Sequence, residues 1–262
     1  MRPDGACQSA AITVYGNGRV VGNRVVFVQD APREKNEVDD DEIFVATLGG
    51  ADRRQLTNRL GSNGRPAWSH DGSRIAFAST RDGNNEIYVI DSDGGRERRL
   101  TFNPAPDRHP SWSPDGSRIA FTSTRDGDEE IYTMSAEGGG EQRLTTNKAV
   151  DTTPAWSPTG SKIAFVSTRD GDEEIYLISV EGGAEQRLTM NPGVDSDPDW
   201  SPEGSQIAFV SIRGDGHEIY TMNGDGTGQR NISRFGGYDV SPQWVPSGLL
   251  FPSRPAPKAE PD

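Results

Sequence analysis

The sequence is poor in the residues that build several familiar kinds of site. It has a single cysteine, Cys7, so it offers no intramolecular disulfide and no cysteine cluster for zinc or iron. Hydrophobic residues make up only 32% of the chain, and no apolar run approaches membrane-spanning length. The 27 lysines and arginines are outnumbered by 40 acidic residues. That balance argues against nucleic acid as a partner, because phosphate binding needs a clustered basic surface.

The two ends of the sequence carry little pattern. We expect residues 1–11 to be a loose lead-in, and the segment MRPDGACQSA contains no apolar h-region of a signal peptide. Residues 252–262 read as a Pro-rich tail without a strand signal. We therefore predict a single domain over residues 12–251, and the sequence by itself leaves its compartment unknown.

What the sequence has in abundance is repetition. Tryptophan recurs at a constant step of 44 residues, at Trp68, Trp112, Trp156, Trp200 and Trp244. The tyrosine of the Glu-Ile-Tyr motif keeps the same step, and Phe44 takes its place in the first copy. A period of this length with several short strands per copy is typical of a propeller or a repeat array.

Each copy contains four short strand signals, as the copy around Trp112 illustrates. After the Pro-x-Trp strand, residues 114–116 have proline and glycine where a type I turn favours them. Residues 119–121 and 130–132 are the second and third strands, and a Gly-rich turn leads to a charged fourth strand at 142–145. Four antiparallel strands repeated radially predict an all-β propeller.

The blade count depends on how the two ends of the repeat meet. The first copy has strand signals at 12–15, 24–28 and 42–47 but no tryptophan strand, whereas the strand of Trp244 lacks a third and fourth partner. The ring closes with five blades if the C-terminal strand joins the N-terminal blade as its inner strand. Six blades are the alternative, if residues 12–15 and 249–251 help to build a further blade.

The repeated motifs resemble those of the TolB-type propeller, which also occurs in relatives of prolyl oligopeptidase. They are P-x-W-S-P-D-G-S-x-I-A-F, S-T-R-D-G-x-x-E-I-Y and G-G-x-x-x-R-L-T, and the resemblance covers about residues 25–244. It implies a propeller that binds other envelope proteins in the periplasm or outside the cell. The sequence has one repeat fewer than TolB and no room for its separate N-terminal domain, so the particular TolB partners do not carry over.

A ring of carboxylates is predicted where the chain enters the tryptophan strands. The period places Asp107, Asp151, Asp195 and Asp239 there, with Asn63 as the first counterpart. At a channel mouth, such a ring would focus negative potential and could bind Ca²⁺ or the cationic side chains of a partner. The alternative is that these aspartates cap their own turns, since turn chemistry alone enriches aspartate.

The residue before each strand proline differs between copies, and such variety is typical of a specific site. His109 is matched at that position by Arg65, Thr153, Asp197 and Ser241. We therefore predict a partner-binding set at the mouth that comprises Asp107, His109, Asp151, Asp195, Asp197 and Asp239, with its four repeated aspartates as the candidate metal ligands. His109 could equally be an ordinary surface or hydrogen-bonded histidine.

Other charged residues recur in the blades and are predicted to be structural, because a catalytic group is needed once whereas a structural pair is needed in each unit. The arginines of the T-R-D-G loops and the glutamates of the Glu-Ile-Tyr motif are expected to form Arg–Glu bridges that brace the loops. The sequence contains no G-x-S-x-G elbow, P-loop or metalloprotease motif.

The function predicted from these observations is that of a non-catalytic, monomeric binding scaffold. Its partner would be a protein with a cationic patch, or a small ligand at the channel mouth. The alternative is a hydrolase or lyase that acts on a small molecule or sugar in the channel, since propellers host both classes. A repeat scaffold without any site is a third possibility.

Overall fold

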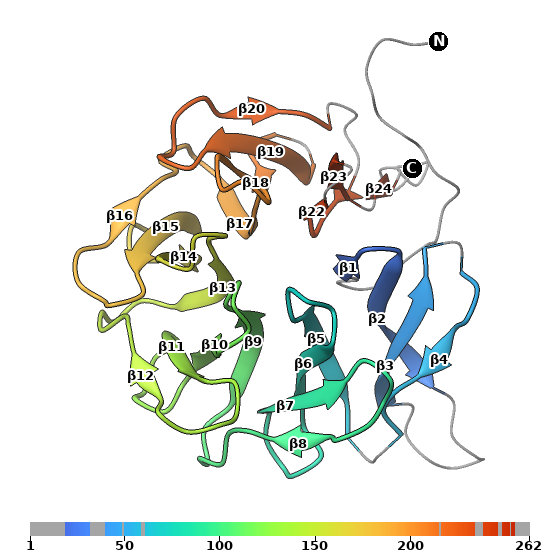
Figure 1. Cartoon of the computed structure of the whole chain (residues 1–262). Coiled ribbons are helices and arrows are strands. Elements are labelled where there is room, and N and C mark those ends of the chain that lie inside the picture. The colour runs from blue at the N-terminus through green and yellow to red at the C-terminus, as the bar shows by residue number, and fades with distance from the viewer. Residues whose placement is uncertain are drawn as a thin grey trace, which may run out of the picture.

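A computed structural model describes residues 19–31, 40–48, 50–58, 61–214, 216–233, 238–245, 248–251 and 253–254. Over these residues the chain is built from strands and turns, with five four-stranded antiparallel sheets arranged around a ring (Figure 1). The predicted all-β propeller with five four-stranded blades is therefore confirmed. None of the described segments is a helix long and apolar enough to cross a bilayer.

Each blade runs from an inner strand at the ring axis to a short outer strand at the rim (Figure 1). The first blade contains β1 (Arg19–Val21), β2 (Arg24–Ala31), β3 (Asp40–Thr47) and β4 (Arg54–Gln55). The second contains β5 (Asn63–Trp68), β6 (Arg74–Ser79), β7 (Glu86–Asp91) and β8 (Arg98–Arg99). The third contains β9 (Asp107–Trp112), β10 (Arg118–Ser123), β11 (Glu130–Ser135) and β12 (Gln142–Arg143). The fourth contains β13 (Asp151–Trp156), β14 (Lys162–Ser167), β15 (Glu174–Ser179) and β16 (Gln186–Arg187). The fifth contains β17 (Val194–Trp200), β18 (Gln206–Ile212), β19 (Glu218–Asn223) and β20 (Arg230–Asn231).

The hydrophobic core lies between neighbouring blades. Trp112 and Phe121 of the third blade pack in one cluster with Ile87 and Val89 of the second. The Trp112 indole Nε1 donates to the Ala67 carbonyl of the second blade at 3.1 Å, so an aromatic ring and a hydrogen bond join the same two blades. The tryptophans thus act in blade packing, where a large buried aromatic contributes most.

Closure of the ring corrects one detail of the prediction. The inner strand of the first blade is β1, which folds back onto β2 through a tight turn, so the C-terminal strand does not take that place. Instead β22 (Gln243–Val245) pairs with β23 (Gly248–Leu250), and β21 (Tyr238–Asp239) pairs with β24 (Ser253–Arg254). These two-stranded sheets fill the ring between the fifth and first blades (Figure 1).

A side chain joins this C-terminal segment to the first blade. The Gln243 amide accepts from the Val20 backbone N–H at 2.6 Å and donates to the Val20 carbonyl at 2.8 Å. One glutamine thereby reproduces the two hydrogen bonds that a neighbouring strand would make. The expected lead-in, the expected strand at 12–15 and most of the Pro-rich tail lie outside the described residues.

Candidate functional site

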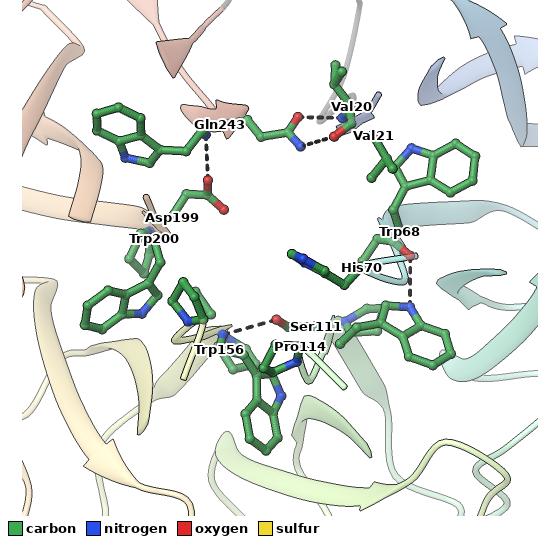
Figure 2. Close-up of a pocket in the computed structure, with 18 of the residues that line it drawn as sticks. Val20, Val21, Trp68, His70, Ser111, Pro114, Trp156, Asp199, Trp200 and Gln243 are labelled. Atoms are coloured by element: carbon green, nitrogen blue, oxygen red, sulfur yellow. Dashed lines mark hydrogen bonds between the residues drawn. The ribbon is translucent and has the colours of Figure 1, made fainter. Parts of the chain in front are cut away.

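A cavity of about 540 Å³ runs along the ring axis, and the inner strands line it (Figure 2). Its lining falls into three levels along the strand direction. The residues before the strand prolines form one end, the residues before the tryptophans form the middle, and His70 with the turn prolines forms the other end. We call the first end the channel mouth, and it consists of Arg65, His109, Thr153, Asp197 and Ser241.

The middle of the channel is used to join blades. The Asp199 carboxylate accepts from the Trp244 backbone N–H at 2.8 Å, and the Ser111 hydroxyl accepts from the Trp156 N–H at 3.5 Å (Figure 2). Each of these bonds links one inner strand to the next. The middle level is therefore part of the frame, which leaves the mouth as the level whose side chains the fold does not require in every blade.

A β-bulge places four of the five mouth residues. In the third blade, Arg108 pairs with Thr122 and Ser111 with Ala120, so His109 and Pro110 together oppose one residue of β10. His109 has a φ of 52°, and the other mouth residues have φ values between 48° and 52°. The left-handed conformation is uncommon for residues other than glycine, and it tends to occur where a side chain serves a purpose.

Burial and cationic neighbours keep His109 neutral. Burial first, and then the charges of Arg65 and Arg108, lower the pKa of His109 to about 3. Its Nδ1 lies 3.0 Å from the Thr152 hydroxyl, which also lies 3.3 Å from the Thr122 hydroxyl. The imidazole is thus a neutral hydrogen-bonding group at neutral pH, with a hydroxyl rather than a carboxylate as its partner.

The other half of the mouth is acidic. Asp197 lies across the channel from Arg65, and burial together with the charge of Asp197 raises the pKa of Glu173. Between the two halves, the Thr153 hydroxyl is buried and has no hydrogen-bond partner among the described residues. The mouth therefore has opposite charges on its two sides and an unused hydroxyl between them.

The structure separates the predicted partner-binding residues into two sets. His109 and Asp197 line the cavity. The other four are fully buried near the entry to the inner strands and lie behind the lining, namely Asp107, Asp151, Asp195 and Asp239. The bulge explains the difference, because it shifts the alternation of the strand between residues 107 and 109.

Three of these buried aspartates pair with an arginine of their own blade. Arg125 reaches Asp107 at 3.0 Å, and the same contact recurs between Arg169 and Asp151 at 3.1 Å and between Arg213 and Asp195 at 2.8 Å. Within the described ranges, no three carboxylates, histidines or cysteines gather as a metal ion would require. Binding of Ca²⁺ by this set stays a prediction.

The loops are braced by charge pairs, as predicted, but with different partners. Arg125, Arg169 and Arg213 pair with the entry aspartates rather than with the Glu-Ile-Tyr glutamates. In the second blade, Arg81 donates to the Asn63 side chain and pairs with Glu97.

The Glu-Ile-Tyr glutamates bind the outer strand instead, and Glu86 accepts from Arg99 at 2.8 Å and from the Thr101 hydroxyl at 2.6 Å. Arg99 also bonds Asp82, which accepts from the Tyr88 hydroxyl. The R-L-T motif was predicted to be an outer strand, and its arginine and threonine are also the hydrogen-bond partners of the Glu-Ile-Tyr glutamate.

The face around the mouth has exposed apolar residues that the sequence analysis missed. In the loops that lead into the inner strands, Phe102 is 72% exposed, Met190 is 71% exposed and Val150 is 40% exposed. The next loops on this face carry exposed acidic residues such as Asp126 and Asp128. We call this surface the mouth face. Phe102 and Met190 occupy the repeat position at which another copy has Thr146. This change of residue between copies is the sequence signal that could have revealed them.

These features place the chain in a known family. A profile of the TolB β-propeller domain matches residues 34–154 and 147–253. The chain belongs to this family.

Among solved structures, TolB from Acinetobacter baumannii is 26% identical with a TM-score of 0.75, and the match covers 86% of this chain and 56% of that one. A putative TolB from Agrobacterium tumefaciens is 24% identical with a TM-score of 0.72, over 90% of this chain and 87% of that one. The dipeptidyl-peptidase 5 of Porphyromonas gingivalis is 35% identical over 63 residues, which are 24% of this chain and 9% of that protein. The chain thus spans about half of the first TolB structure and a small part of the peptidase.

Proposed function

We propose that this TolB-like propeller is a non-catalytic binding scaffold whose mouth face receives a protein partner with a basic, partly apolar surface. The observation that carries the proposal is the contrast between blades that repeat their packing residues and a mouth face whose exposed side chains differ from blade to blade. The similarity to TolB supports a scaffold of this class, and it also supports a periplasmic or extracellular location as part of the proposal.

Chemistry of the mouth face supports a partner of this type. Phe102 and Met190 are large apolar side chains that gain by burial, and such residues serve as anchors at the centre of interfaces. On the same face, Asp128 and Asp172 are exposed, and Asn84 stands at that repeat position in the second blade. The net charge of −13 would steer a cationic partner toward the surface.

Peptide selection on the immobilised protein tests this proposal. Peptides selected from a random library should carry lysine or arginine beside aromatic or aliphatic residues, and their affinity should fall as salt rises. Phe102→Ser and Met190→Ser should each weaken a selected peptide by about tenfold or more. Leu48→Ser is the matched control, because Leu48 is an exposed apolar residue that follows the end of β3, on the opposite face.

Equal weakening by Leu48→Ser, or selection of peptides without basic residues, would contradict the proposal.

A channel enzyme is the second candidate, and the half-buried, neutral His109 inside the cavity is the observation that favours it. Turnover of chromogenic ester or glycoside substrates that is lost in His109→Asn would support the enzyme and count against a purely binding role.

A further inference from the structure

Arg65 and Asp197 form an ion pair across the channel rather than between neighbours. Arg65 lies on β5 of the second blade and Asp197 on β17 of the fifth. The third and fourth blades separate them on one side of the ring, and the first blade with the C-terminal sheets separates them on the other (Figure 1). Because an Arg65 Nη1 to Asp197 Oδ1 contact of 4.0 Å nevertheless joins them, their side chains bridge the mouth of the cavity.

This cross-channel pair is long and accessible to solvent. The side chain of Arg65 is 46% exposed and that of Asp197 is 28% exposed. Ion pairs at such distance and exposure contribute little to stability, since water already solvates both charges. A ligand that offered its own charges to both groups could therefore replace the direct contact at small cost.

The two sides of the pair differ in charge. Arg65 and Arg108 both lower the pKa of His109. Arg108 is paired with Glu129 at 3.6 Å, so the positive charge on this side comes mainly from Arg65. On the opposite side, Glu173 lies within the field of Asp197. The mouth is thus cationic around Arg65 and anionic around Asp197, an arrangement that orients a dipolar ligand in one direction.

The cavity beneath the pair has the size and polarity of a small-molecule site. Its volume of about 540 Å³ falls within the range of ligand pockets. The Thr153 hydroxyl, buried without a partner, lies in the fourth blade between His109 and Asp197 in ring order. A buried hydroxyl without a partner gains by a hydrogen bond to a ligand.

We propose that the channel mouth binds a small zwitterion, an α-amino acid or a short peptide with both ends free, with its carboxylate on Arg65 and its ammonium group on Asp197. In a dipeptide, the Thr153 hydroxyl then hydrogen-bonds the peptide group between the two charged ends. This site lies inside the channel and differs from the apolar loops proposed to dock a protein. Either proposal can therefore fail without the other.

Isothermal titration calorimetry with alanine and with alanyl-alanine as probes tests the site, together with N-acetylated and C-amidated alanyl-alanine. At least one free zwitterion should bind, and each blocked dipeptide should bind at least about tenfold more weakly than the free dipeptide. Arg65→Gln should remove the preference for a free carboxylate, and Asp197→Asn the preference for a free ammonium group. Because both side chains are partly exposed, both variants should retain the thermal unfolding of the parent protein.

Arg96→Gln is the control, since Arg96 pairs with Asp91 at 3.2 Å on the outer surface and its side chain is 87% exposed. That variant should bind like the parent protein. If neither free zwitterion binds at about 10 mM, the proposal is overturned. Equal binding of free and blocked dipeptides overturns it as well, and so does unchanged selectivity in Arg65→Gln and Asp197→Asn.

Discussion

The Arg125–Asp107 and Arg65–Asp197 pairs join the same two chemical groups in very different settings. Arg125 holds a fully buried aspartate at 3.0 Å, and this contact recurs in the next two blades. Arg65 reaches a partly exposed aspartate at 4.0 Å across the channel, and neither residue repeats in the other blades. Repetition thus marks the pairs that brace each blade, whereas single occurrence marks the pair that we propose to serve a ligand.

Removal of a side chain that packs between two blades should have the largest effect on stability. Trp112→Ala should lower the free energy of unfolding by about 3–5 kcal/mol, because it leaves a cavity between the second and third blades. It also removes the hydrogen bond to the Ala67 carbonyl. Urea unfolding followed by fluorescence measures the change.

Thr153→Ala at the mouth is the companion variant, since it deletes a hydroxyl without a hydrogen-bond partner. It should change the stability by less than about 0.5 kcal/mol. If both variants lost the same stability, the division between frame and mouth would be wrong.

The two arginines themselves provide a matched test. Arg125→Met should cost about 3 kcal/mol or more, because it leaves the Asp107 carboxylate buried without its countercharge. Arg65→Met removes an accessible ion pair and should cost about 0–1 kcal/mol. Chemical unfolding of both variants at pH 7 measures the difference, and a larger loss for Arg65→Met would contradict the assignment of the two pairs.

His109 gives the mouth its own dependence on pH. The folded protein holds its pKa near 3, below the usual value of 6.5. A lowered pKa means that the unfolded chain binds the proton first, so the stability from neutral His109 is complete above pH 6.5 and declines as pH falls toward 3. Between pH 7 and pH 5 the parent protein should lose about 1–2 kcal/mol through this group.

His109→Asn removes the titrating group and should reduce that loss, as unfolding curves at the two pH values would measure. His70→Asn is the control, because His70 lies exposed in a turn at the other end of the channel. An unchanged acid loss in His109→Asn would show that the imidazole is not held neutral by its surroundings.

Much of the fold could be predicted because its signals are local and repeated. The tryptophan step and the turn glycines define strands and turns within a single copy, and four full copies agree. Closure of the ring was not predictable in the same way. Residues 19–21 form a strand too short to stand out in the sequence, yet their tight turn onto β2 decides which segment occupies the inner edge of the first blade.

The site was predicted in part, for a geometric reason. His109 and Asp197 stood out because they vary, and both line the cavity. Asp107 was expected beside His109, since residues two apart share a face of a regular strand. The bulge breaks that alternation, which leaves Asp107 buried against Arg125. Phe102 belongs to a loop without a strand pattern, so variation at its repeat position was the sequence signal available for it, and the folded protein shows that it is exposed.

The most direct test replaces the charged and imidazole side chains of the channel mouth with serine. In a triple variant, Arg65→Ser, His109→Ser and Asp197→Ser copy the residue that Ser241 already provides at this position with a φ of 49°. We predict that the melting temperature stays within about 3 °C of the parent protein. Binding of the free zwitterion that the parent protein recognises should be lost. A large fall in melting temperature with binding retained would contradict the account, because the mouth would then belong to the frame and not to the site.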